Sequence, residues 1–238
     1  MACQRLIRSI SSHRPAPVCA PPRRALPLGR GARAGALAVT LAATLLAGCA
    51  PMYAQNPPGA LRPVNATAVG TEDRLMLKGA DVVAYFTQGR YLQGVPAHRS
   101  VYQGVAFHFA SAQHKALFDA APQSYLPQYG GYCANGIVYG IPWGGDADTW
   151  QLIDGKLYIF GGAASRDAFA LDVTGNRRLA NRYWAQEVAG SHSFVQRAWR
   201  LVWRVPHYKS GAELADAVAQ AKAKAKAMES TTPKPAQP

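Results

Sequence analysis

The stretch Trp150-Gln-Leu-Ile-Asp-Gly-Lys-Leu-Tyr-Ile-Phe160 is the part of the sequence that most clearly decides the fold. Strand-forming residues flank Asp154-Gly155, a pair that suits the tight type I′ turn of a two-residue hairpin. A second stretch, Val101-Tyr-Gln-Gly-Val-Ala-Phe-His-Phe109, has strand-forming residues on both sides of Gln103-Gly104. The sequence therefore predicts two antiparallel hairpins.

Helices are predicted after these hairpins. Ser111 is a suitable cap for a helix that runs to about Asp119, and two more helical segments follow at residues 163–171 and 176–188. Hairpins interleaved with short helices indicate an α+β fold. We expect a small single domain of antiparallel hairpins with several short helices and a C-terminal helical extension. We find no internal repeat.

Residues 1–48 have the composition of a secretory signal. They contain seven arginines and no acidic residue, and they end in the apolar run Ala36–Ala47. As a helix, this run is too short to cross a hydrocarbon core of about 30 Å. The sequence Leu46-Ala47-Gly48-Cys49 resembles the lipobox of bacterial lipoproteins, in which the cysteine is acylated and becomes the new amino terminus after cleavage.

The lipobox resemblance implies a location for the protein. Cys49 would carry a diacylglycerol and a further acyl chain such as palmitate, so its partner is membrane lipid. In lipoproteins of bacteria with two membranes, an Asp after the cysteine retains the protein at the inner membrane. Ala50 stands there instead. We therefore expect an outer-membrane lipoprotein that faces the periplasm.

The strong positive charge is concentrated in this leader. The whole sequence has 26 basic and 13 acidic residues, and a net charge of +13 by itself would suggest nucleic-acid binding. Without residues 1–48, 19 basic residues remain against 13 acidic ones, and the net charge falls to +6. Three of these charges, on Lys222, Lys224 and Lys226, lie in an Ala/Lys-rich tail. We therefore expect no nucleic-acid partner.

Composition divides the rest of the chain into four parts. Residues 49–70 are rich in Pro, Ala and Gly and are predicted to form a flexible tether. The globular domain is expected at residues 71–190, and a Trp/Arg-rich helix is expected at residues 191–210. Residues 211–238 form an Ala/Lys-rich tail whose first half can be a solvated helix and whose Pro-rich end is predicted to be disordered.

Four ordered motifs lie between Leu77 and Trp184: Asp81-Val-Val-Ala-Tyr-Phe86, Phe107-His-Phe-Ala-Ser111, Tyr129-Gly-Gly-Tyr-Cys-Ala134 and Asn181-Arg-Tyr-Trp184. Taken together they resemble the YHS-domain proteins, particularly the secreted bacterial branch of that family. The resemblance covers somewhat under half of the chain. It does not include the leader, the Trp-rich segment or the tail.

The YHS family is similar to small modules that bind soft metals such as copper through cysteines. The resemblance places the first two of those cysteines at Ala84 and Ala110, and the third ligand at His114. Alanine cannot bind a metal, and a metal site normally needs three or four ligands. The cysteine-based copper site is therefore not carried over to this chain.

Cys133 is the first candidate for a functional side chain. It is the only cysteine after Cys49, so it has no disulfide partner within the mature domain. A reactive thiolate needs a nearby cation or helix N-terminus, and without one the residue is simply a small buried side chain. With His108 and His114 it would form a site for a metal ion or small ligand, if the fold brings the three together.

Other chemical patterns are weak. Asp146-Ala-Asp148 lacks the further oxygen ligands of a calcium loop. The sequence contains no nucleophile elbow, phosphate-binding loop or dinucleotide fingerprint. We therefore expect a binding protein rather than an enzyme.

The segment Phe194–Val205 predicts a short amphipathic helix. The helix either rests on an anionic membrane surface or a partner, or packs its tryptophans on the domain while its arginines stay in solvent. We expect the second arrangement, because the segment is short for an independent surface helix. The candidate contact residues lie on two neighbouring faces: Arg197, Arg200 and Arg204 on one, Trp199 and Trp203 on the other.

Three functional hypotheses follow. The first is a membrane-anchored periplasmic YHS-domain lipoprotein that binds a metal ion or small ligand at Cys133, His108 and His114, without catalysis. The second is a thiol-dependent redox enzyme that uses Cys133. The third is an envelope adaptor that acts through the Trp/Arg-rich helix.

Overall fold

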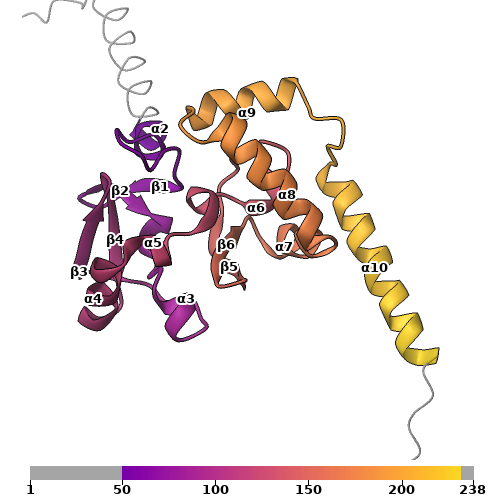
Figure 1. The fold of residues 1–238 in the computed structure, drawn as a ribbon, viewed down its shortest axis with the longest axis horizontal. Coiled ribbons are helices and arrows are strands. Elements are labelled where there is room, and N and C mark those ends of the chain that lie inside the picture. The colour runs from indigo at the N-terminus through magenta and orange to yellow at the C-terminus, as the bar shows by residue number, and fades with distance from the viewer. Residues whose placement is uncertain (1–49, 232–238) are drawn as a thin grey trace, which may run out of the picture. The chain divides into compact units, whose positions relative to one another are not determined.

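The structure, a computed structural model, describes residues 50–231 (Figure 1). Within these residues the fold is α+β, as the sequence predicts. One sheet has four strands in the order β1-β2-β4-β3, and a separate hairpin is formed by β5 and β6. The candidate acylation site at Cys49 lies outside the described residues.

The elements of the described part follow one another along the chain in this order: α2 (Ala50–Gln55), β1 (Ala66–Val69), β2 (Glu72–Met76), η1 (Leu77–Gly79), α3 (Ala84–Thr87), β3 (Val95–Tyr102), β4 (Val105–Phe109), α4 (Ala112–Ala120), α5 (Pro122–Tyr125), η2 (Gln128–Gly131), α6 (Ala134–Ile137), β5 (Asp146–Ile153), β6 (Lys156–Phe160), α7 (Ala163–Ala170), α8 (Val173–Tyr183), η3 (Trp184–Val188), α9 (Ser193–Val202) and α10 (Gly211–Thr231). Of these, η1 and η2 are 3₁₀ turns and η3 is a π-helical turn.

The prediction of a flexible tether at residues 49–70 is wrong for residues 50–70. The segment contains α2 and β1, and the side chains of Ala54, Val64 and Ala66 are fully buried. β1 pairs antiparallel with β2, which in turn pairs parallel with β4 through Leu75 and Ala106. Small apolar residues in a four-residue strand carry too little periodicity to be recognised, and tertiary pairing stabilises the strand instead.

Both predicted hairpins are confirmed. The turn residues Asp154 and Gly155 have φ values of 50° and 69°, and Gln103 and Gly104 have φ values of 49° and 81°. Two successive residues with positive φ make the type I′ turn, whose twist matches that of the strands. The predicted cap is also confirmed, because the Ser111 hydroxyl accepts a hydrogen bond from the His114 backbone N–H at 3.1 Å.

Two parts of the chain share one construction, a repeat of the backbone that the sequence does not reveal. We call them the first module (residues 77–120) and the second module (residues 129–170). Each consists of a 3₁₀ turn, a one-turn helix, a hairpin and a longer helix. Both hairpins pair a strand of 8 residues with one of 5. Both also have a register shift at the same place, between Val95 and Arg99 or between Asp146 and Trp150.

The backbone conformation repeats as well. Three successive residues with positive φ precede each one-turn helix: Leu77, Lys78 and Gly79 in the first module, and Tyr129, Gly130 and Gly131 in the second. The side chains have diverged much further. Identity between equivalent positions is confined to a few glycines, alanines and aromatic residues, such as Phe118 and Phe169. Sequence inspection therefore gives no clear sign of the repeat.

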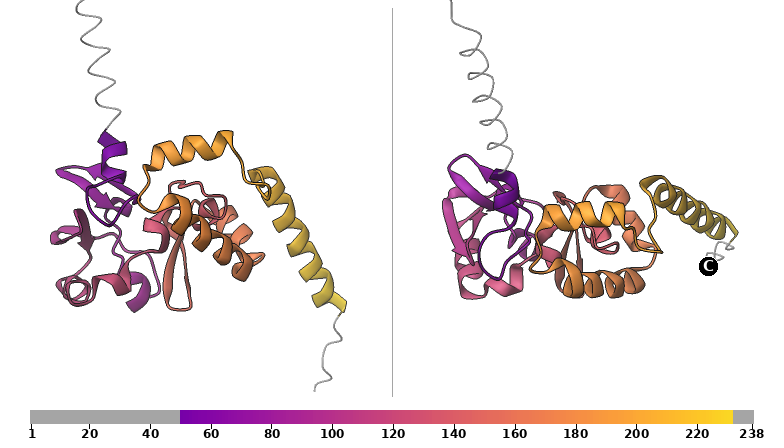
Figure 2. Two further views of the ribbon diagram at one scale, coloured as in Figure 1. Left: turned by 45° about the horizontal axis from the view of Figure 1, so that its top comes forward. Right: turned by 90° about the horizontal axis from the view of Figure 1, so that it is seen from above.

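The core consists of two clusters of buried apolar side chains. The first lies around Phe107, Phe109 and Phe118 of the first module. The second lies around Tyr158, Phe160 and other residues of the second module, and includes buried side chains of α8 and η3. α10 packs against α7, and Figure 2 shows α9 and α10 as separate helices joined by an extended segment.

Gly94 tests how closely the segment before β3 approaches β4. A Cβ added there would lie 2.4 Å from the carbonyl carbon and oxygen of His108, which are backbone atoms that cannot move aside. We expect Gly94→Ala to lower the free energy of unfolding by about 2–3 kcal/mol, measured by chemical denaturation. Gly144→Ala is the matched control, because nothing lies within 4 Å of its added Cβ. Equal stability of the two variants would contradict the close approach.

Candidate functional site

Cys133 lies on the wall of a cavity in the second module. Its backbone N–H donates to the Trp143 carbonyl at 2.9 Å, and it forms an isolated parallel bridge with Ile159 of β6. The residue is 3% exposed. The cavity beside it has a volume of about 240 Å³ and is also lined by Asn135, Ser165 and Lys209. We call it the Cys133 cavity.

Asn135 is the most unusual residue of this cavity. It is only 6% exposed, yet no group among residues 50–231 forms a hydrogen bond with its side-chain amide. The amide atoms are not sealed from solvent, so water in the cavity can hydrogen-bond to them until a ligand takes its place. Such a group lining a cavity is therefore available to a ligand.

The surroundings of the cavity set its charge. Burial, followed by the neighbouring Tyr208 and Glu213, raises the pKa of the Tyr139 phenol above its ordinary value. This phenol lines the cavity and stays neutral at physiological pH. Lys209 is exposed and also lines the cavity. Among the residues that line the cavity, the charged one is a cation, which favours a ligand with negative charge.

The predicted site of Cys133, His108 and His114 is not assembled. His114 lies in the first module, where its Nδ1 is 2.6 Å from Asp81 Oδ2 and its Nε2 is 3.1 Å from the Thr87 hydroxyl. Both ring nitrogens of His114 are therefore occupied by other partners. Among residues 50–231, no group of three His, Cys, Asp or Glu side chains could hold a metal ion.

The positions that the family resemblance gives to metal ligands do converge, but on a carboxylate. The backbone N–H groups of Ala84 and Ala110 donate to Asp81 at 3.3 and 2.8 Å. The His114 ring is hydrogen-bonded to the same carboxylate. Asp81 is fully buried, and its side chain stands where the resemblance would place the metal. The donors around it are N–H groups and not metal ligands, so this centre does not fit copper.

His108 lies on β4 and is almost fully buried. Its Nε2 is 3.7 Å from Glu72 Oε1, too far for a hydrogen bond, and has no partner among the described residues. A hydrogen bond from Arg99, opposed by partial burial, holds the pKa of Glu72 below its usual value. Glu72 is thus an anion beside the imidazole. His108 therefore belongs to the environment of Glu72 in the first module and not to the Cys133 cavity.

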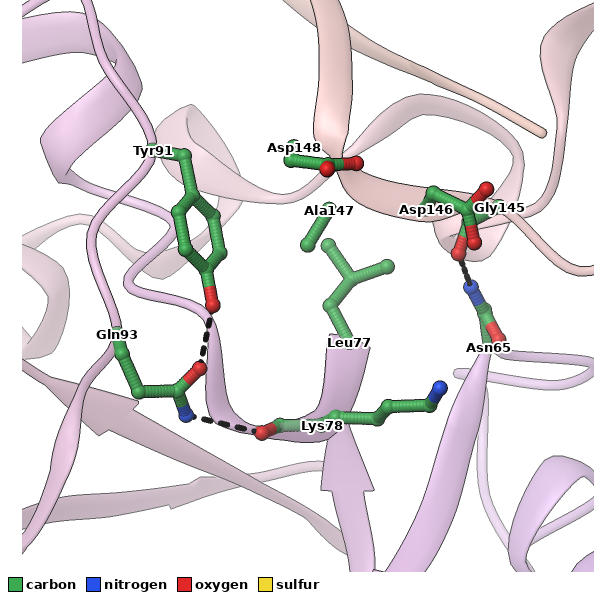
Figure 3. Close-up of a pocket in the computed structure, with 9 residues that line it drawn as sticks. All are labelled: Asn65, Leu77, Lys78, Tyr91, Gln93, Gly145, Asp146, Ala147 and Asp148. Atoms are coloured by element: carbon green, nitrogen blue, oxygen red, sulfur yellow. Dashed lines mark hydrogen bonds between the residues drawn. The ribbon is translucent and has the colours of Figure 1, made fainter. Parts of the chain in front are cut away.

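A larger pocket of about 350 Å³ lies where β5 begins (Figure 3). Figure 3 shows Tyr91 and Gln93 on one side of it, and Asn65 and Asp146 on the other. The Gln93 amide accepts from the Tyr91 hydroxyl at 2.6 Å and donates to the Lys78 carbonyl at 3.0 Å. The Asn65 amide donates to the carbonyls of Gly131 and Gly145. Unlike Asn135, the amide side chains of this pocket are therefore already paired with protein groups.

The amphipathic helix is α9, and its faces are the reverse of the expected arrangement. Arg200 forms an ion pair with Glu187, and Arg197 donates to the Pro142 carbonyl at 2.9 Å. Both arginines therefore face the domain. The tryptophans face solvent, with Trp199 55% exposed and Trp203 59% exposed. The prediction that tryptophan packs on the domain is wrong, because Glu187 and the loop carbonyls offer polar partners to the inner face.

The outward face of α9 is apolar over its whole length. It presents the exposed side chains of Phe194, Val195, Trp199, Val202 and Trp203, which we call the α9 apolar face. Arg204 follows the helix and stacks over the Tyr208 ring at 4.8 Å. Within residues 50–231, no helix is long and apolar enough to cross a membrane.

Sequence reasoning selected Cys133 but missed its neighbours. Asn135 lies two residues after Cys133, just beyond the Tyr129–Ala134 motif, and a polar amide so near a candidate thiol is a signal that could have been used. Ser165 and Lys209 come from distant segments, so only the fold places them there. No protein-family model, curated protein or solved structure matches the chain.

Proposed function

We propose that this chain is an outer-membrane lipoprotein of the YHS type whose folded part binds a small molecule, without a metal ion, in the Cys133 cavity. The observation that carries this proposal is the Asn135 side chain, which lines the cavity beside the thiol, is 6% exposed and has no hydrogen-bond partner among residues 50–231. A ligand that hydrogen-bonds to this amide takes the place of water in the cavity.

The chemistry of the cavity favours a small ligand with an anionic group. A volume of about 240 Å³ is at the lower limit of small-molecule sites. The Asn135 amide supplies two N–H donors, the Ser165 hydroxyl a third, and Lys209 a positive charge. Aromatic rings of Tyr139 and Trp143 complete the wall. A small carboxylate is therefore the ligand class that fits best.

Alkylation of Cys133 tests whether small anions enter. We expect iodoacetate and iodoacetamide to label the thiol in the folded chain, because the thiol lines the cavity. Removing the cation in Lys209→Gln should reduce the rate with iodoacetate, relative to iodoacetamide, by about two- to fivefold. The readout is the mass of the Cys133 peptide over time.

Lys156→Gln is the matched control, because it removes the same charge from β6 at a residue that does not line the cavity. Its ratio of the two rates should equal that of the wild type. Millimolar acetate should slow labelling in the wild type. A folded chain that resists both reagents would rule out entry of a ligand at this thiol.

A second candidate function is supported by the α9 apolar face: contact with the membrane surface. Ser193, the first residue of α9, is fully buried, and its N–H donates to the Asn56 side chain at 2.8 Å, just after α2. α2 begins at Ala50, next to the proposed acylation site. Figure 1 shows α9 beside α2. An acyl chain at Cys49 would therefore hold the membrane close to the start of α9.

The proposed acylation has a direct test. Cys49→Ser removes the sulfur that would receive the diacylglycerol, so we expect the chain to leave the membrane fraction, measured by blotting after ultracentrifugation. Cys133→Ser is the control and should stay in the membrane fraction, because it leaves the anchor in place. A Cys49→Ser chain that remains in the membrane fraction would refute acylation at this site.

The membrane contact is tested with the unanchored Cys49→Ser chain and vesicles of phosphatidylethanolamine and phosphatidylglycerol. We expect binding in a flotation assay, and at least about tenfold weaker binding after Trp199→Ser with Trp203→Ser. Thermal stability should hardly change, because both rings are more than half exposed. Val101→Ser, on an exposed side chain of β3, is the control. Equal flotation of all three proteins would contradict this role for α9.

A further inference from the structure

We propose that Cys133 is a site of oxidation by peroxide, and that its sulfinate is held by the backbone amides that correspond to those around Asp81. The inference rests on the proposed function only in that the Cys133 cavity admits a small molecule. It is carried by the repeat of the two modules, in which the thiol and the carboxylate occupy equivalent positions.

In the first module, the equivalent position is occupied by the Asp81 carboxylate and its hydrogen-bond donors. One Asp81 oxygen accepts from the N–H groups of Val83 at 2.9 Å and Ala84 at 3.3 Å. The other accepts from the N–H of Ala110 at 2.8 Å and is 2.6 Å from the His114 ring nitrogen. A fully buried anion is therefore satisfied by backbone donors and one side chain.

Cys133 is the counterpart of Asp81 by its backbone contacts. The Asp81 N–H donates to the Leu92 carbonyl, and the Cys133 N–H donates to the Trp143 carbonyl, both at 2.9 Å. The Asp81 carbonyl accepts from Ala84 at 3.2 Å, and the Cys133 carbonyl accepts from Gly136 at 2.9 Å. The same register makes Asn135 the counterpart of Val83.

The hairpin supplies the remaining counterparts. The residue after β4 is Ala110 and the residue after β6 is Gly161. Ser165 is the third residue of α7, as His114 is of α4. Gly161 lies against the cysteine, because a Cβ added to it would be 3.6 Å from Cys133 Sγ.

The donors are present in the second module, but they lack an acceptor. Among residues 50–231, neither the Asn135 N–H nor the Gly161 N–H has a hydrogen-bond acceptor. The hydroxyl of Ser165 has no partner there either. The Asn135 side chain, 6% exposed and unpartnered, adds two more donors to the same cavity. We call this set the empty amide cradle.

A sulfinate on Cys133 would supply the acceptor that the empty amide cradle lacks. It places two anionic oxygens on the atom attached to Cβ, as the carboxylate of aspartate does. Charged acceptors of this kind make the stronger class of hydrogen bonds. The thiol itself is a poor acceptor and leaves these donors unpaired.

The oxidation balances with peroxide as the oxidant. The Cys133 thiol gives its proton to water, and the thiolate sulfur attacks one peroxide oxygen while the O–O bond breaks. Sulfenate forms, and the second oxygen leaves as hydroxide and takes a proton to become water. A second peroxide repeats the transfer, so that sulfenate becomes sulfinate and another water forms.

No second thiol among the described residues can react with the sulfenate to form a disulfide. Cys133 is the only cysteine among residues 50–231. Without a second thiol, the sulfenate does not close to an internal disulfide and proceeds to sulfinate.

Mass spectrometry of the full chain, purified in detergent, tests the proposal. After treatment with hydrogen peroxide, we expect the Cys133 peptide to gain two oxygen atoms and to stop there. The oxidised protein should melt about 4 °C above the reduced protein, because the cradle donors become paired. A thiol that stays unmodified, oxidation that continues to the sulfonate, or a fall in melting temperature would each overturn the proposal.

Two variants isolate the cradle. Ser165→Ala should leave the melting temperature of the reduced protein unchanged and reduce the gain on oxidation by about a fifth, since one of the five donors is missing. Cys133→Asp supplies the carboxylate directly and should melt within about 4 °C of the wild type. Ala168→Asp is its control, since Ala168 is also 3% exposed but lies outside the cradle, and should lose far more. Equal losses in both Asp variants would overturn the proposal.

The alkylation experiment separates this proposal from ligand binding. If Cys133 is alkylated by iodoacetate but never gains a stable pair of oxygens, the sulfinate proposal fails and the binding proposal stands. If neither iodoacetate nor hydrogen peroxide modifies the thiol, the binding proposal and the sulfinate proposal both fail.

Discussion

The first module depends on one buried charge. Asp81 is fully buried, and the loss of water from a carboxylate costs several kcal/mol unless hydrogen bonds replace it. Its partners come from the start of α3, from the residue after β4 and from α4. Satisfying this one side chain therefore fixes three elements relative to one another. The aromatic cluster around Phe118 is part of the same core, which also includes the neighbouring Val82 and Val83.

Much of this fold could be predicted from local signals. Asp154-Gly155 and Ser111 define a turn and a cap through their own backbone preferences, and the structure confirms both. The strand β1 could not be predicted, because four residues show no periodic pattern. Its partner β2 joins the sheet through a long-range pairing of Leu75 with Ala106, which local sequence does not reveal. The repeat could not be predicted, because the two modules share a backbone but few side chains. Glycine is retained where the backbone turns most sharply, as at Gly79 and Gly131, and most other positions differ.

The candidate site shows the same division. Composition and spacing selected Cys133, but the partners proposed for it, His108 and His114, belong to the other module. The orientation of α9 was also missed, because an amphipathic pattern does not say which face meets the protein. Glu187 decides this, since an arginine on the inner face gains an ion pair that a tryptophan cannot form.

The repeat also bears on how the chain has been able to change. Two copies of one scaffold share a molecule, and in the first copy the position equivalent to Cys133 is closed by a carboxylate with four polar contacts. Substitution of Asp81 would therefore destabilise the folded protein. The second copy leaves its equivalent donors unbound, so residues around it can vary at little structural cost. Division of labour between a constrained copy and a permissive one gives selection a place to alter chemistry without rebuilding the protein.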